Sequence, residues 1–196
     1  MKTTVKFLPA LAAGVLVLAA CSGPEEPATS ADAALGGAYL ATDCAIQGPP
    51  TEVEDPPAGA TAPGVVVADG GEGIPVVYVA ADAAPATELQ VVTIRPGNGP
   101  SAALGDNITV NYCGVGLSTG TLFDSSWVRG EPATFPLVEG GLIAGWTQGV
   151  PGMQLGEQSL LVIPSDLAYG SNPPPGIEPD ESLVFVVELR DINGEG

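Results

Sequence analysis

The sequence predicts an α+β domain in which an antiparallel sheet curves over one short helix. Several short runs of β-branched residues are separated by glycine- and proline-rich turns, which is typical of antiparallel sheets. Only residues 144–150 are a good candidate for a short helix, which Pro151 and Gly152 would end. A sheet and a single helix of this kind each bury one face against the other.

The β-prone runs follow one another from residue 65 onward, at residues 65–67, 76–79, 89–94, 108–115, 159–163 and 183–189. In the fourth run Ile108, Val110 and Tyr112 occupy alternate positions, which places them on one face of a strand. Glycine- and proline-rich stretches at 98–106, 116–120, 129–133 and 170–182 predict loops.

The first 20 residues have the layout of a secretory signal. Lys2 and Lys6 precede an apolar stretch, residues 7–20, that is too short to span a bilayer. It ends in Leu18-Ala19-Ala20 before Cys21, which resembles the lipobox where bacterial lipoproteins are cleaved and lipidated. We therefore expect Cys21 to carry a lipid that anchors the protein to the extracytoplasmic face of the cell membrane. An ordinary signal peptide that happens to contain a cysteine is the alternative.

Composition divides the rest of the chain. Residues 21–63 are rich in alanine, proline, glycine, threonine and glutamate, so we expect a disordered, flexible tether there. Residues from 64 onward hold nearly all the β-branched and aromatic side chains, enough for one domain. We divide them into a β-prone upstream extension, residues 64–87, and a main domain, residues 88–196. Whether the extension packs on the domain stays open.

Charge and composition exclude several classes of function. The chain has five basic and 23 acidic residues, a formal net charge of −18 and no histidine, and both lysines lie in the signal. Such a surface cannot neutralise phosphates, so nucleic acid is excluded as a partner. The absence of histidine removes catalytic triads and histidine-based zinc sites. The acidic residues are scattered without the pattern of a calcium loop, and we expect no metal and no cofactor.

Short motifs occur in a fixed order within residues 88–192. They are VNYCG at 110–114, FDSS at 123–126, PATF at 132–135, LIAGW at 142–146, LAYG at 167–170 and LVFVVEL at 183–189. Each motif alone is a weak signal, but the ordered set is specific. In order and spacing it resembles the FKBP-type peptidyl-prolyl cis-trans isomerases. The resemblance implies a five- to six-stranded antiparallel sheet wrapped on one short helix.

The resemblance also implies a pocket that grips proline. The implied catalytic residues are Tyr112, Phe123, Asp124, Trp146, Tyr169 and Phe185. The implied substrate-binding residues are Phe135, Leu142, Ile143 and Ile177. Trp146 would form the floor, while Asp124 and Tyr169 would supply fixed polar contacts. The alternative for each aromatic residue is a place in the core alone, as is usual in a β domain.

Isomerisation needs no histidine because no covalent bond forms or breaks. Rotation about a peptide bond meets a barrier of about 18–20 kcal/mol, and cis and trans Xaa–Pro bonds differ by only about 1 kcal/mol. A dry apolar pocket that favours the twisted amide over either planar form is sufficient. The implied function is acceleration of Xaa–Pro rotation in exported proteins, by a monomer anchored to the membrane through Cys21. Pro-containing segments would be its partners and macrolides its inhibitors; the alternative is a non-catalytic chaperone or adaptor for such segments.

Two cysteines remain if Cys21 carries a lipid. An exported protein meets an oxidising environment, so Cys44 and Cys113 are candidates for a disulfide, with two free thiols as the alternative. Because Tyr112 faces the pocket, Cys113 points to the opposite face of its strand. A bridge would therefore hold the N-terminal segment across the back of the sheet.

Overall fold

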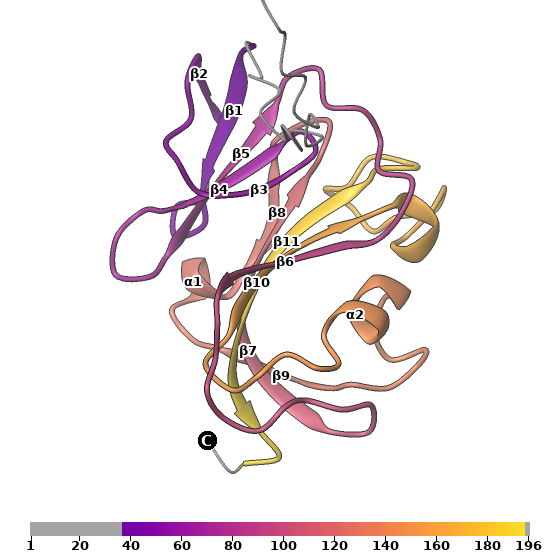
Figure 1. Cartoon of the computed structure of the whole chain (residues 1–196). Coiled ribbons are helices and arrows are strands. Elements are labelled where there is room, and N and C mark those ends of the chain that lie inside the picture. Colours follow the sequence, from indigo (N-terminus) through magenta and orange to yellow (C-terminus); the bar gives the residue numbers. More distant parts are fainter. Residues whose placement is uncertain (1–36, 195–196) are drawn as a thin grey trace, which may run out of the picture. The chain divides into compact units, whose positions relative to one another are not determined.

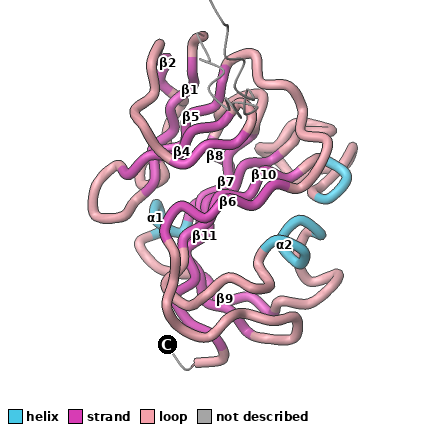
Figure 2. The backbone as a smooth tube through the Cα atoms, viewed as in Figure 1, coloured by secondary structure: helices cyan, strands magenta, loops and turns pink. Residues whose placement is uncertain are grey.

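A computed structural model describes residues 37–194, which form two antiparallel sheets (Figures 1 and 2). The five-stranded sheet, here the upstream sheet, has the order β2-β1-β5-β4-β3. Its strands are β1 (Tyr39–Asp43), β2 (Thr51–Val53), β3 (Ala60–Ala62), β4 (Val65–Asp69) and β5 (Pro75–Ala80). The expected signal and Cys21 lie outside the described residues.

The second sheet, here the main sheet, has six strands. They are β6 (Gln90–Arg95), β7 (Asn107–Gly116), β8 (Leu122–Ser125), β9 (Ala133–Pro136), β10 (Gln158–Ile163) and β11 (Leu183–Ile192). Their order is β6-β10-β11-β7-β8, and β9 pairs with the first half of β7 while β8 pairs with the second half. Helix α2 (Ala144–Gly149) faces this sheet, which confirms the predicted α+β fold (Figure 1).

Both faces of the main sheet are buried because the two faces pack against different partners. On β11, Phe185 and Val187 belong to the core beneath α2, whereas Val184 and Val186 pack with the valines of β4 and β5. The whole of β10 is buried for the same reason. Burial of this apolar surface stabilises the association of the two sheets by about 25 cal/mol per Å².

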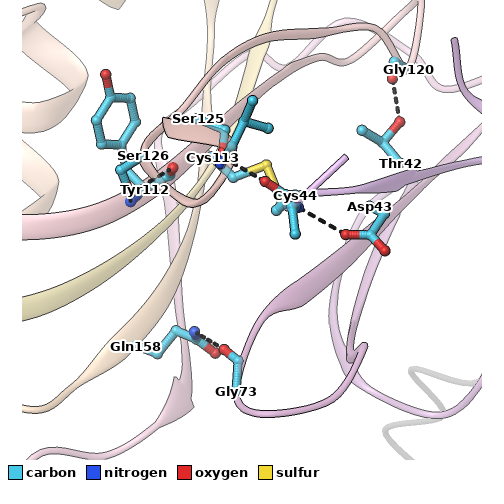
Figure 3. Close-up of a disulfide and its surroundings, with 12 residues drawn as sticks. Thr42, Asp43, Cys44, Gly73, Tyr112, Cys113, Gly120, Ser125, Ser126 and Gln158 are labelled. Carbon is cyan, nitrogen blue, oxygen red and sulfur yellow. Dashed lines mark hydrogen bonds between the residues drawn. A yellow bond between two sulfur atoms is a disulfide. The ribbon is translucent and has the colours of Figure 1, made fainter. Parts of the chain in front are cut away.

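A disulfide links the two sheets on the face of the main sheet that points away from α2. Cys44, directly after β1, forms a disulfide with Cys113 in β7, and their Cα atoms are 5.6 Å apart (Figure 3). Both residues are fully buried. The disulfide lies one residue beyond Tyr112, on the face of β7 that points away from α2, because successive side chains of a strand alternate between faces.

The structure corrects the expected boundary of the tether. Residues 39–62, which we assigned to a disordered segment, contain β1, β2 and β3, and Tyr39 is 1% exposed. The segment is poor in large apolar groups, but β1 pairs with valine-rich β5 and gains the disulfide at Cys44. Residues 64–87 are thus not a separate extension, because β4 and β5 share the upstream sheet with β1.

Other elements follow the sequence prediction more closely. The predicted runs correspond to β4, β5, β6, β7, β10 and β11, and helix α2 ends one residue before the predicted limit. The sequence prediction missed β8, β9 and α1 (Ser126–Arg129), which have four residues each. None of the helices within residues 37–194 has the length and apolar character needed to cross a membrane.

Candidate functional site

A cavity of about 470 Å³ opens on the side of the main sheet that carries α2. Its lining includes eight of the ten residues that the resemblance implies: Tyr112, Asp124, Phe135, Leu142, Ile143, Trp146, Tyr169 and Phe185. They come from β7, β8, β9, β11, α2 and the loops that flank α2 and the 3₁₀ turn Ser165–Leu167. The fold thus brings together residues that are far apart in the sequence.

An aromatic cluster centred on Trp146 forms the base of the cavity. The Trp146 ring lies 5.6 Å from Tyr112, 5.7 Å from Phe135 and 5.3 Å from Phe185, measured between ring centroids. All three contacts are edge-to-face, the arrangement that the aromatic quadrupole favours. The rings therefore support one another, and they present a firm apolar surface to a ligand.

Two of the implied residues lie beside the cavity rather than in its lining. Phe123 packs edge-to-face on Phe185 with ring centroids 5.5 Å apart. Phe123 and Ile177 both line a neighbouring cavity of about 260 Å³. Their contact with the main cavity is indirect, since each packs on the core cluster that holds Phe185 and Trp146.

A polar network of three residues closes one wall. The Tyr112 hydroxyl donates a hydrogen bond to Asp124 Oδ2, and the Arg129 guanidinium forms an ion pair with Asp124 Oδ1. Arg129 also donates to the Tyr112 hydroxyl at 2.9 Å, and its guanidinium carbon lies 5.3 Å from the Tyr112 ring centroid. The carboxylate is thus held on both sides, and its orientation is fixed by two partners.

The sequence prediction gave no role to Arg129. Arg129 occurs five residues after Asp124. It is one of three arginines in the chain, and the two lysines, the other basic residues, both lie in the expected signal. In a chain with 23 acidic and only five basic residues, an arginine this close in sequence to Asp124 could have indicated a role at the site. The single turn of helix α1 brings the Arg129 guanidinium back to the Asp124 carboxylate.

The surroundings raise the pKa of both tyrosines at the site. Burial, together with the hydrogen bond to Asp124, raises the pKa of Tyr112 to about 12, although the contact with Arg129 acts in the opposite direction. Burial also raises the pKa of Tyr169, and the negative charge of Asp124 acts in the same direction. Both phenols therefore keep their protons at neutral pH, and each can donate a hydrogen bond.

Local contacts set the positions of the network. Gly114 of β7 pairs with Asp124 of β8, which fixes the carboxylate opposite the strand that carries Tyr112. The Tyr112 backbone N–H donates to the Ser126 hydroxyl at 2.8 Å. At the floor, Trp146 Nε1 is buried without a hydrogen-bond partner among residues 37–194. The same residues contain no cluster of three histidine, cysteine, aspartate or glutamate side chains that could hold a metal.

Known proteins resemble the chain over its second half. Residues 99–190 match the family model described as FKBP-type peptidyl-prolyl cis-trans isomerase. An FK506-binding protein of Streptomyces anulatus is 46% identical over 107 residues, which are 54% of this chain and 86% of that protein. The FKBP-type peptidyl-prolyl cis-trans isomerase FkpA of Escherichia coli K12 is 43% identical over 106 residues, which are 54% of this chain and 38% of that protein.

Solved structures agree with these matches. The crystal structure of FkpA from Escherichia coli superposes with a TM-score of 0.50 and 42% identity, covering 54% of this chain and 48% of that one. The crystal structure of AtFKBP13 superposes with a TM-score of 0.50 and 34% identity, covering 55% and 94%. By its fold, its ordered motifs and these matches, the chain belongs to the FKBP family and is an FKBP-type peptidyl-prolyl cis-trans isomerase.

Proposed function

We propose that this isomerase accelerates Xaa–Pro rotation in exported proteins while a lipid on Cys21 anchors it to the outer face of the cell membrane. The observation that carries the catalytic part is the aromatic cavity with a polar network on one wall. The observation that carries the location is the lysine-led apolar stretch that ends at Cys21.

The cavity has the character that amide rotation requires. A proline ring placed on Trp146, between Tyr112, Phe135 and Phe185, would be shielded from water. Removing water from the amide carbonyl weakens the resonance that keeps the bond planar. The twisted amide has less charge separation than either planar form, so an apolar pocket stabilises the twisted form selectively. No nucleophile and no proton transfer are involved.

We propose that Asp124 and Tyr169 orient the substrate. Tyr169 keeps its hydroxyl proton and can donate to a carbonyl next to the proline. Asp124, fixed by Tyr112 and Arg129, presents a negative edge to the same space. Leu142 and Ile143 lie in the lining just before α2, where their backbone would accompany an extended substrate. Relatives bear the name FK506-binding protein, and we expect a macrolide of that kind to compete for this cavity.

The site assignment is tested with a double variant. We expect Asp124→Ala plus Tyr169→Phe to lower kcat/KM for a short Xaa-Pro peptide by about tenfold, because each change removes one fixed polar contact. Protease-coupled isomerisation with residues 22–196 measures the rate. Full activity in the double variant would refute the assigned roles. Binding of the peptide by the wild type without acceleration would instead favour the non-catalytic chaperone or adaptor.

The location is tested with one substitution in the full-length chain. We expect the mature wild type to begin at Cys21, to carry a diacylglycerol on the thiol and to sediment with membranes of an expressing bacterium. Cys21→Ala should abolish both lipidation and membrane association, because a buried lipid contributes about 0.8 kcal/mol per methylene. Ser22→Ala is the matched control. A Cys21→Ala protein that still sediments with membranes through its mature part would refute the lipid anchor.

A further inference from the structure

We propose that Ser125 is a positioning residue through which the upstream sheet holds the Tyr112–Asp124–Arg129 network in its active arrangement. The proposal rests on the isomerase activity and deepens it, since it makes a sheet outside the matched region part of the machinery of the site. The matched region begins at residue 99, whereas the upstream sheet ends at Ala80.

Ser125 occupies a junction of three elements. It is the last residue of β8, it directly follows Asp124, and it is the N-cap of α1. In the main sheet it lies opposite Cys113, the residue that carries the disulfide. The side chain is 3% exposed, so its hydrogen bonds are made within the protein.

One oxygen atom of Ser125 joins the upstream sheet to α1. The hydroxyl donates to the backbone carbonyl of Cys44 at 2.6 Å and accepts from the backbone N–H of Val128 at 3.3 Å. Figure 3 shows Ser125 beside Cys113 and directed to Cys44. A hydroxyl can serve as donor and acceptor at once, and here its donor bond fixes the direction of the lone pair that caps the helix.

Helix α1 depends on this cap because it consists of a single turn. Four residues make too few internal hydrogen bonds to hold a helix by themselves. The last of the four is Arg129, whose guanidinium contacts both Asp124 and Tyr112. A change in the orientation of α1 therefore moves the Arg129 guanidinium, which holds Asp124 and Tyr112 in place on the wall of the cavity.

The upstream side of the contact is firmly held. Cys44 is fully buried and bridged to Cys113, and its N–H donates to the Pro75 carbonyl at 3.1 Å. Thr42 adds a second link, since its hydroxyl donates to the Gly120 carbonyl in the turn between β7 and β8. The Cys44 carbonyl is thus a fixed acceptor, against which Ser125 and α1 are aligned.

The test is Ser125→Ala, with Ser159→Ala as the matched control. Ser159 is also fully buried in the main sheet, but its hydroxyl donates to Glu157, away from the network. We expect Ser125→Ala to lower kcat/KM for an Xaa-Pro peptide by about threefold to tenfold, and Ser159→Ala to leave kcat/KM within about twofold. Both proteins are assayed as residues 22–196, with their fold checked by circular dichroism.

A spectroscopic readout separates positioning from general destabilisation. The chain after residue 21 has three arginines, so three Nε–H resonances are resolvable in a ¹⁵N–¹H spectrum. We expect the Arg129 resonance to shift or broaden in Ser125→Ala. The resonances of Arg95 and Arg190, which both pair with Glu188, should stay in place.

The outcomes decide the proposal independently of the catalytic assignment. An unmoved Arg129 resonance, equal shifts of all three arginines, or unchanged kcat/KM in a folded Ser125→Ala protein would overturn it. If Ser125→Ala does not fold, Ser125→Gly replaces it, because glycine is tolerated at an N-cap but has no hydroxyl to bond the Cys44 carbonyl. A selective Arg129 shift is again expected, and its absence would overturn the proposal. A wild type without isomerase activity would refute the function proposed above, yet the Arg129 spectrum would still report whether Ser125 holds the network.

Discussion

Replacing both Cys44 and Cys113 by alanine is expected to lower the free energy of unfolding by about 4 kcal/mol. The two cysteines are 69 residues apart, and a crosslink over a loop of that length removes much of the conformational freedom of the unfolded chain. Such a loss is a large part of the net stability of a domain, which is typically about 5–15 kcal/mol. Urea unfolding followed by tryptophan fluorescence measures it.

The control for this prediction is reductant. In residues 22–196 the double alanine variant contains no cysteine, so dithiothreitol should leave its unfolding midpoint unchanged and shift only that of the wild type. A loss below about 1 kcal/mol in the double variant would mean that the unfolded chain stays compact without the bridge, so that the crosslink removes little conformational freedom. The role of the disulfide in stability would then be minor.

The main sheet could be predicted because its long strands carry an obvious pattern. Residues 183–187 of β11, for example, are apolar throughout, and the ordered motifs locate such runs within one known fold. The same run lacks polar alternation, which is typical of a strand with both faces buried, although the sequence prediction did not draw that conclusion. What it could not show was the identity of the second partner.

The composition of residues 39–62 gave no indication of the first three strands of the upstream sheet. These strands have three to five residues, and they stand among prolines and glycines that suggested a tether. They are strands because β1 finds a long antiparallel partner in β5, from Tyr39 opposite Ala80 to Asp43 opposite Val76. Pairing over such separations is a tertiary effect that local propensity does not encode.

At the site, residue types were predictable and their contacts were not. The motifs located Tyr112, Asp124 and Trp146, and these three line one cavity. The ion pair from Arg129 depends on a one-turn helix, and the place of Phe123 behind Phe185 depends on packing. The sequence prediction also gave no role to Gly114, although it is the last residue of the first motif.

Gly114→Ala is expected to lower kcat/KM by about tenfold to a hundredfold. Gly114 lies on the same face of β7 as Tyr112, opposite Phe185 on one side and Asp124 on the other. A Cβ atom there would lie 2.5 Å from Phe123 Cζ and 2.9 Å from Phe185 Cε1, which is too close for either ring to stay. Overpacking of this kind costs about 1–3 kcal/mol, and each 1.4 kcal/mol of barrier is about tenfold in rate.

The effect should reach the floor of the cavity, because Phe185 packs directly on Trp146. The tryptophan fluorescence, to which Trp146 and Trp127 both contribute, and the near-ultraviolet circular dichroism should therefore change together with the rate. Gly48→Ala is the matched control, since a Cβ there meets nothing within 4 Å, and it should leave kcat/KM within about twofold. If Gly114→Ala keeps full activity, Phe123 and Phe185 can move without harm, and the shape of the aromatic wall does not limit isomerisation.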